Sequence, residues 1–593
     1  MSTRVRAPEL HGRGWLNTGG ASYSIADFRG RFVLLDFWTF CCVNCLHVLD
    51  ELRDLEREYA EELVVVGVHS PKFVHEADPV ALAAAVERYD VHHPVLDDPD
   101  LVTWQAYTAR AWPTLVLVDP EGYIVGQYAG EGHAHAIGAL LAALVPVARD
   151  RGTLQPGDSP YVALPVEPGD LRFPAKAVRW GDHLLVADAG HHQVVELDGA
   201  TVVRRIGTGE RGLADGQSPA FSEPNGLCVL PPEVAAEVGY DVVVADTVNH
   251  ALRGIAMDTG AVSTLAGDGE QWMQGEPTDR LSSPWDVAWW QGKVWIAMAG
   301  IHQLWTFDPA TRTVEVAAGT TNEGLVDGPL DDAWFAQTSG LSSAGERLWL
   351  ADSEVSAVRY VEDGRVGTLA GRGLFEFGFR DGPVDEALFQ HPLGVLALDD
   401  GSVAVADTYN GAVRLIRDGQ VETLASGLAE PSGLVEDGDH LIVVESAAHR
   451  LTRVPLGARA SADGTGQVTQ RPPTDVAPGE LEIVVEFTPP PGQKVDDRFG
   501  PASQLLITST PPALIAAGEG RGTELTRTVR IDPVVGGGVL HIAARAASCD
   551  AEGGEGAACH MHQQDWGVPI RVSPDGTPQL VLPLSGWTDP LVR

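Results

Sequence analysis

The chain has 593 residues, which is more than one hydrophobic core organises, so we expect several domains. Its 41 basic and 82 acidic side chains leave a net charge of −41, which argues against binding to nucleic acid or to an anionic membrane surface. The apolar runs are too short to span a bilayer and the first residues carry no apolar signal core, so we predict a cytoplasmic protein. Six cysteines do not indicate a disulfide-stapled secreted fold, and a close cysteine pair in the cytosol is typical of redox catalysis or metal binding.

Residues 1–150 predict a domain of alternating strands and helices. The apolar run Phe32–Trp38 indicates a strand covered on both faces. Leucines recur every three or four positions from Leu49 onward, as on one face of a helix. A second buried strand is expected at Leu63–His69, a second helix at Ala81–Tyr89, and a hairpin beginning with Thr114–Val118.

The most informative motif of the chain is the cysteine cluster after the first strand. Cys42 lies where the strand ends and the helix begins, a position at which exposed N–H groups favour a thiolate. Cys45 lies one helical turn later and would resolve a mixed disulfide formed at an exposed Cys42. Asp36, if buried beneath the pair, would have a raised pKa suited to taking the proton of Cys45. Cys41 is expected to pack in the core, with an auxiliary thiol as the alternative.

The FWxxxCxxC pattern and the later Trp112-Pro113-Thr114 resemble the thioredoxin superfamily, in particular the branch with a helical insertion after the second strand. The resemblance implies a thiol–disulfide oxidoreductase fold. It also implies a cis proline at Pro113 beside the cysteine pair, and a substrate site shaped by Trp38, Trp112 and Pro113.

Two departures limit what the resemblance implies. Cys41 stands where an aromatic residue usually precedes the motif, and Val43-Asn44 replaces the usual Gly-Pro, so potential and substrate preference do not carry over. An inactive relic of the motif is one alternative. A zinc site that includes His47 is another, although no second CxxC and no spaced histidine pair supports it.

From about residue 170 to 457 one phrase occurs six times, in forms such as VVVADTVNHALR and VAVADTYNGAVR. Each copy predicts a strand, a polar turn and a second strand, so residues 165–460 predict a six-bladed β-propeller. The copies resemble NHL repeats. We expect the anchoring side chains to cap their turns rather than to catalyse; they are Asp188, Asp246, Met298, Asp352, Asp407 and Glu445.

Four histidines also recur at equivalent turns, at positions 192, 250, 302 and 449, and this raises a second possibility for the propeller. Six-bladed relatives include lactonases and lyases with a metal in the central channel, so a metal-dependent hydrolase or lyase is an alternative. Ser356 and Gly411 interrupt the histidine pattern. We therefore expect the propeller to bind a protein or peptide on its Gly-rich loop face.

The C-terminal part begins with a polar, Pro/Gly-rich segment, residues 461–479, which predicts a linker. Residues 480–593 predict a small β-sandwich that resembles the immunoglobulin-like, cysteine-pair domains of bacterial thiol–disulfide interchange proteins. Nine residues join Cys549 and Cys559, which would reach disulfide distance. Three interpretations stay open: a structural staple, a second redox pair serving Cys42 and Cys45, or a metal site formed by Cys559, His560 and His562.

The order of thioredoxin-like domain, six NHL-like blades and terminal β-domain resembles the NHL repeat-containing protein 2 family. The leading hypothesis is a cytosolic thiol–disulfide oxidoreductase with a redox-active disulfide and no other cofactor or metal. Its substrate would be a protein or peptide disulfide, and its electron donor would be of the thioredoxin-reductase type. A non-catalytic interaction scaffold is the alternative.

Overall fold

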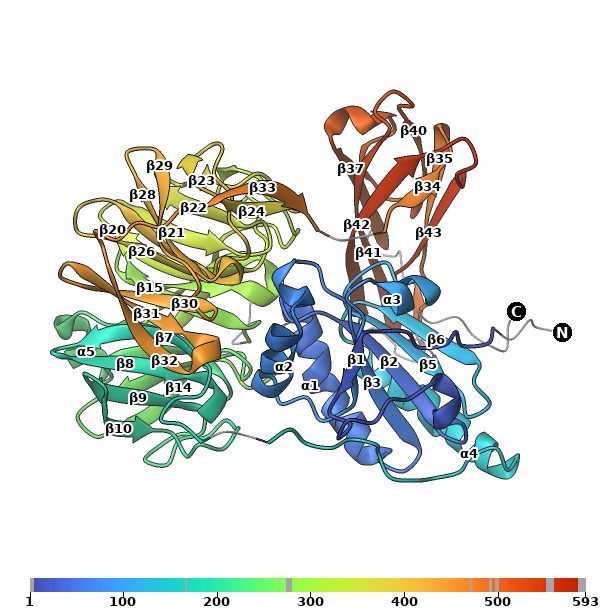
Figure 1. Ribbon diagram of the computed structural model, residues 1–593, viewed down its shortest axis with the longest axis horizontal. Coiled ribbons are helices and arrows are strands. Elements are labelled where there is room, and N and C mark those ends of the chain that lie inside the picture. The colour runs from blue at the N-terminus through green and yellow to red at the C-terminus, as the bar shows by residue number, and fades with distance from the viewer. Residues whose placement is uncertain are drawn as a thin grey trace. The chain divides into compact units, whose positions relative to one another are not determined.

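The computed structural model describes residues 5–165, 168–272, 280–469, 472–489, 493–495, 501–550 and 559–584 (Figure 1). The chain forms two compact units: residues 1–165 together with 470–593, and residues 166–469. In the described part of the chain, no helix combines the length and apolar character that a membrane span requires. The fold class predicted from the sequence is confirmed: a thioredoxin-like α/β domain, a propeller of small antiparallel sheets and a C-terminal β-sandwich.

The first domain contains one mixed sheet with the strand order β1-β4-β3-β2-β5-β6. β2 is parallel to β3, and β3 to β4, whereas β5 and β6 continue the sheet as an antiparallel hairpin. The strands are β1 (Gly14–Leu16), β2 (Phe32–Trp38), β3 (Leu63–His69), β4 (Val95–Asp97), β5 (Thr114–Val118) and β6 (Ile124–Ala129). The three strands predicted from apolar runs therefore have the predicted bounds.

Helices cover the sheet and place the cysteine cluster. They are α1 (Val43–Glu58), α2 (Pro79–Arg88), α3 (Val102–Ala106) and α4 (Ala134–Asp150). Leu52 of α1 and Leu141 of α4 share one apolar core with Leu34 of β2 and Val65 of β3. The even-numbered residues of β2 and the odd-numbered residues of β3 therefore face α1. The unit continues beyond the predicted boundary at residue 150, because Gln155 N donates to Gly30 O at 2.6 Å.

The propeller consists of six consecutive antiparallel sheets in its described residues (Figure 1). The first three comprise β7 (Pro174–Trp180), β8 (His183–Asp188), β9 (Gln193–Asp198) and β10 (Thr201–Ile206); β11 (Pro224–Val229), β12 (Val242–Asp246), β13 (Ala251–Ala256) and β14 (Ala261–Ala266); and β15 (Pro284–Trp290), β16 (Lys293–Met298), β17 (Gln303–Asp308) and β18 (Thr313–Ala318). A short helix, α5 (Pro232–Val238), lies between β11 and β12.

The other three sheets complete the ring. They comprise β19 (Gly328–Pro329) with β20 (Thr338–Ala344), β21 (Arg347–Asp352), β22 (Ala357–Glu362) and β23 (Arg365–Ala370); β25 (Gly382–Pro383) with β26 (Gly394–Ala397), β27 (Val403–Asp407), β28 (Ala412–Arg417) and β29 (Gln420–Ala425); and β30 (Pro431–Asp437), β31 (His440–Glu445) and β32 (Arg450–Pro455). The last sheet packs against the first, and Ser432 Oγ donates to Ala175 O at 2.7 Å.

The segment predicted as a linker, residues 461–479, is not a simple linker. It contains β33 (Asp463–Val468), which pairs with β24 (Glu376–Arg380), and β34 (Thr474–Val476), which pairs with β42 of the C-terminal domain. Strand pairing uses backbone groups, which a Gly-rich polar sequence still supplies. The boundary between the two compact units falls inside this segment, between residues 469 and 470.

The C-terminal domain packs two sheets around one apolar core. One sheet has the order β34-β42-β41-β37-β39 and the other β38-β40-β35-β43. Their strands are β35 (Gly479–Glu486), β36 (Gln493–Val495), β37 (Ser503–Thr510), β38 (Ile515–Ala517), β39 (Gly520–Gly522), β40 (Thr526–Ile531), β41 (Gly537–Asp550), β42 (Cys559–Val572) and β43 (Gln579–Pro583).

Candidate functional site

The cysteine cluster lies at the N-terminus of α1, as its sequence position indicates. Cys42 is the residue before the first helical residue, and its carbonyl accepts from Cys45 N at 3.0 Å. Cys42 is 6% exposed and Cys45 is fully buried, so the order of accessibility is the expected one, although Cys42 is far less exposed than predicted. Cys41 is buried too. All three are thiols in this structure, and those of Cys42 and Cys45 are hydrogen-bonded to each other.

Asp36 lies on the same face of the sheet as α1 and has no exposed surface. Neither of its carboxylate oxygens has a hydrogen-bond partner among the described residues. Burial raises the pKa of Asp36 well above its usual value, and the charges of Glu56, Cys42 and Glu51 raise it further. Burial also raises the pKa of the Cys45 thiol, the hydrogen bond with Cys42 adds to this, and the Lys72 ammonium opposes it. Asp36 and Cys45 are thus both buried, and the charge of Asp36 also raises the pKa of the Cys45 thiol, so each group favours its protonated form.

The loop before Cys42 is held by Glu76, a buried carboxylate that sequence reasoning missed. Oε1 of Glu76 accepts from the Thr39 hydroxyl and, at 2.9 Å, from Cys41 N. Oε2 accepts from Lys72 N at 2.9 Å and from Phe73 N at 3.0 Å. One side chain of the helical insertion therefore joins the cysteine loop to the loop that follows β3. No local sequence signal predicts this contact, because the partners lie on separate loops.

Trp112 and Pro113, the predicted substrate-binding residues, form a buried wall. The Trp112–Pro113 peptide bond is cis, as the thioredoxin resemblance implies. Trp112 stacks on Trp104 with ring centroids 4.1 Å apart, and its indole N–H donates to Ser70 O at 2.7 Å. Lys72 Nζ lies 5.5 Å from the centroid of the Trp112 ring, so the wall carries a buried cation.

Trp38 was predicted to contribute to the substrate site, but its side chain is fully buried. It faces α1 and packs edge-on against His69, with ring centroids 5.4 Å apart. The structure therefore does not place Trp38 on a surface that a substrate would meet. Burial, together with the charge of Arg13, lowers the pKa of His69 to about 3, so the imidazole is neutral at physiological pH.

The C-terminal cysteines lie on two adjacent strands. Cys549 is buried and disulfide-bonded, and the register of β41 and β42 sets Cys559 opposite it. The side chains of Cys559 and His560 lie outside the described residues. His562 Nε2 forms a hydrogen bond with Ser548 Oγ at 2.8 Å. The C-terminal core includes Ala111, and Arg110 donates to Thr474 Oγ1 at 2.7 Å, so this domain packs against the loop that precedes Trp112.

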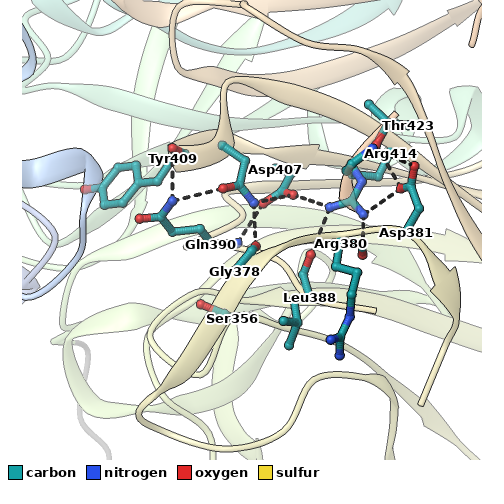
Figure 2. A network of polar contacts seen from close by, with 12 residues as sticks. Ser356, Gly378, Arg380, Asp381, Leu388, Gln390, Asp407, Tyr409, Arg414 and Thr423 are labelled. Carbon is teal, nitrogen blue, oxygen red and sulfur yellow. Dashed lines mark hydrogen bonds and ion pairs between the residues drawn. The ribbon is translucent and has the colours of Figure 1, made fainter. Parts of the chain in front are cut away.

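The repeated acids of the propeller hold neighbouring backbone. Figure 2 shows the arrangement at Asp407, whose Oδ1 accepts from Gln390 N at 2.8 Å. Its Oδ2 forms an ion pair with Arg414, which is fully buried and also pairs with Asp381 at 2.8 Å. The same geometry recurs in two further sheets, with the pairs Asp246–Arg253 and Asp352–Arg359. These carboxylates are occupied by structural partners.

The repeated histidines join one sheet to the next. His192, His250, His302 and His449 each have a left-handed backbone, and each accepts a backbone N–H of the following sheet at Nδ1. Ser356 accepts in the same way from His391 N at 3.1 Å. At the equivalent position Gly411, no side chain takes this role, because a Cβ there would lie only 2.5 Å from Leu428 O. In the described residues, no group of three or more His, Cys, Asp or Glu side chains has a geometry suited to a metal ion.

A buried ion pair spans the middle of the propeller. Lys176 of β7 pairs with Asp286 of β15, with Nζ 3.7 Å from Oδ2. Their sheets are not neighbours in the ring, so the pair must cross the central channel. Nζ also donates to Leu393 O and, at 2.9 Å, to Ser432 O. The Lys176 ammonium is thus buried among two carbonyl oxygens and a carboxylate.

Comparison with known proteins places the chain among thioredoxin-like, NHL-repeat proteins. A thioredoxin-like family model matches residues 30–124. NHL repeat-containing protein 2 of Gallus gallus is 32% identical over 580 residues, which cover 82% of this chain and 78% of that protein. Protein SUPPRESSOR OF QUENCHING 1, chloroplastic, of Arabidopsis thaliana is 34% identical over 497 residues, covering 75% of this chain but only 46% of its own length. A crystal structure of a thioredoxin-like superfamily protein is 28% identical, covers 24% of this chain and 96% of its own, and has a TM-score of 0.23.

Proposed function

The chain belongs to the NHL repeat-containing protein 2 family, and on that premise we propose that it is a thiol–disulfide oxidoreductase that uses Cys42 and Cys45. One observation carries the proposal: two hydrogen-bonded thiols at a helix N-terminus lie near a buried aspartate that has no other partner among the described residues. The thioredoxin-like family match supports redox function at the level of the family.

The proposed reaction has two steps. Cys42 Sγ attacks one sulfur of a protein or peptide disulfide, and the other substrate sulfur leaves as a thiolate. Cys45 then gives its proton to Asp36 and attacks Cys42 Sγ. This forms the Cys42–Cys45 disulfide and releases the second substrate thiolate. Two electrons pass from the cysteine pair to the substrate, and a thioredoxin-reductase-type donor returns them.

The two thiols differ in solvent exposure, and we assign them different roles on that basis. Cys42 has the only exposed surface of the pair, so in this proposal it meets the substrate, and Trp112 and Pro113 would shape the substrate site. Cys45 is protected from solvent until a mixed disulfide exists at Cys42. The propeller would then select or hold the protein substrate. A cytosolic location stays part of the proposal, together with a second redox pair formed by Cys549 and Cys559.

The test is a redox titration of the full chain, with differential alkylation and mass mapping of all six cysteines. We expect Cys42 and Cys45 to pair reversibly near the cytosolic potential. Cys42→Ser should abolish exchange with a peptide disulfide, whereas Cys45→Ser should accumulate the mixed disulfide at Cys42. Cys228→Ser removes a buried thiol outside the cysteine cluster and is the matched control. It should leave thiol–disulfide exchange unchanged. Full exchange in Cys42→Ser would refute the assignment.

One observation favours the alternative, a scaffold whose thioredoxin-like domain is structural: Cys42 exposes only 6% of its surface. Rapid alkylation of Cys42 near neutral pH, compared with Cys228, separates the two functions. Slow alkylation of both, together with no pairing in the titration, would favour the scaffold.

A further inference from the structure

Four residues surround a point on the face of the sheet that α1 covers, and we call them the Gly67 site: Asp36, Trp38, Gly67 and His93. Asp36 and Gly67 are register partners on adjacent parallel strands, so both face α1. A Cβ added at Gly67 would lie 2.9 Å from Trp38 Nε1 and 3.1 Å from His93 Nε2. Glycine is therefore needed here, because any side chain would press on two buried ring nitrogens.

The polar atoms at this site lack partners. Within the described part of the chain, Trp38 Nε1, His93 Nε2 and both oxygens of Asp36 form no hydrogen bond. The three side chains are at most 3% exposed. Buried polar groups are nearly always paired, with protein or with an ordered water. Trp38 Nε1 and His93 Nε2 both lie close to Gly67, and Asp36 is its neighbour on the adjacent strand, so an internal water is the partner that these atoms would share.

The second ring nitrogen of His93 lies close to a carboxylate that is partly exposed to solvent. Nδ1 of His93 lies 3.0 Å from Glu56 Oε1, and the Glu56 side chain is 20% exposed. Asn17 Nδ2 donates to Val91 O at 2.7 Å and to His93 O at 3.1 Å, which fixes the loop that presents the imidazole. The imidazole thus has one nitrogen toward the Gly67 site and one on a carboxylate that reaches solvent.

We propose that His93 and Glu56 form the proton outlet of Asp36, with one internal water at the Gly67 site joining Asp36 to His93 Nε2. This deepens, and rests on, the proposed oxidoreductase function. The Asp36 proton passes to the water, and a water proton passes to His93 Nε2. The Nδ1 proton then leaves through Glu56 to solvent, which restores Asp36 as an acceptor. His93 is a positioning and relay residue, since it contacts neither thiol in the described contacts.

The charges around this path determine where a proton is held. Burial raises the pKa of Asp36, and the charges of Glu56, Cys42 and Glu51 raise it further, so Asp36 needs an outlet for a proton taken from Cys45. Burial would raise the pKa of Glu56, but His93, Arg53 and His92 hold it below its usual value, so Glu56 passes an incoming proton on to solvent rather than keeping it.

The experiment separates the two steps of one turnover in the full-length protein. The probe is an aromatic disulfide whose thiolates absorb on release: attack by Cys42 releases the first, and attack by Cys45 releases the second. We expect His93→Gln to leave the first phase unchanged and to slow the second about tenfold, a modest share of what acid–base catalysis supplies. The solvent deuterium isotope effect on the second phase should also change.

Two further variants provide a control and an independent test of this interpretation. His135→Gln, the same substitution at an exposed histidine of α4, should leave both phases unchanged. Glu56→Gln changes a partly exposed side chain and keeps its shape, and it should slow the second phase in the same direction even where His93→Gln does not fold. Unchanged second phases and isotope effects in Glu56→Gln and in folded His93→Gln would overturn the outlet. A second phase missing from the unmodified protein would instead refute the oxidoreductase function.

Discussion

His449 in the last sheet of the propeller accepts a hydrogen bond from the backbone N–H of Phe173, which precedes the first sheet, and the Nδ1···N distance is 2.9 Å. The two rings also meet edge to face, with centroids 4.5 Å apart. In the described residues, no strand of the last sheet pairs with a strand of the first. Side-chain contacts close the ring instead: this one, the bonds of Ser432 to Ala175 O and of Lys176 to Ser432 O, and an apolar core shared by the two sheets.

His449→Ala should therefore weaken the propeller, because it removes the imidazole that accepts from the buried Phe173 N–H. We expect a loss of about 1–3 kcal/mol, seen as a lower urea midpoint for propeller unfolding. His440→Ala is the matched control, since His440 lies in the same sheet and bonds only to exposed Asp439 among its described partners. Equal midpoints for the two variants would show that ring closure does not depend on this bond.

Two arginines on β28 offer a direct comparison of buried and exposed ion pairs. Arg414 is fully buried between Asp407 and Asp381 (Figure 2), whereas Arg417 forms an exposed pair with Asp400. Arg414→Met should cost about 3–5 kcal/mol because it strands two carboxylates. Arg417→Met should cost under about 1 kcal/mol. Urea unfolding of both variants measures the difference, and comparable losses would contradict the structural role assigned to the repeated acids.

The effects on stability of substituting Lys176 and Asp286 should be coupled, because the two side chains form a buried ion pair. Lys176→Met leaves the Asp286 carboxylate buried in the channel without its cation, and a loss of about 3 kcal/mol is expected. Adding Asp286→Asn should recover part of that loss, because the amide carries no charge and its oxygen still accepts from Leu341 N. Recovery is incomplete because the Val287 N–H loses the second carboxylate oxygen as its acceptor. A double-mutant cycle by urea unfolding checks this. Additive losses would mean that the ion pair across the channel contributes nothing.

The junction between α1 and α4 should be sensitive to pH. Glu51 accepts from Gly132 N at 2.7 Å, and burial together with the Glu131 charge raises its pKa to about 7. A raised carboxyl pKa means that the folded state binds the proton more tightly than the unfolded chain, so stability is full below about 4.5 and falls as pH rises through about 7. The loss is at most about 3 kcal/mol. His47 has a pKa that Glu131 raises in spite of burial, so it acts in the same direction.

Glu51→Gln should remove most of this pH dependence. Hydrogen exchange of the α1 and α4 amides, corrected for intrinsic rates, would report it at pH values on either side of the transition. Glu58→Gln, an exposed acid on the same helix, is the control and should keep the wild-type slope. A persistent slope in Glu51→Gln would assign the effect to another group.

The sequence by itself determined the elements whose signals are local. The apolar runs predicted β2, β3 and β5 with their bounds, since a strand buried on both faces needs only a contiguous apolar sequence. The start of α1 at Cys42 followed from the break between that run and the helical pattern. The six repeats predicted the propeller, because each copy carries its own anchoring side chain and left-handed turn.

Only the tertiary structure decided which distant residues meet. Glu76 reaches the cysteine loop across 35 positions, His93 reaches Glu56 across 37, and His449 reaches Phe173 across 276. Such contacts depend on the path of the backbone between the partners, which periodicity and composition do not encode. Contacts from distant parts of the chain also explain three features that the sequence did not predict. They are the low exposure of Cys42, the full burial of Trp38 and the buried position of Lys176.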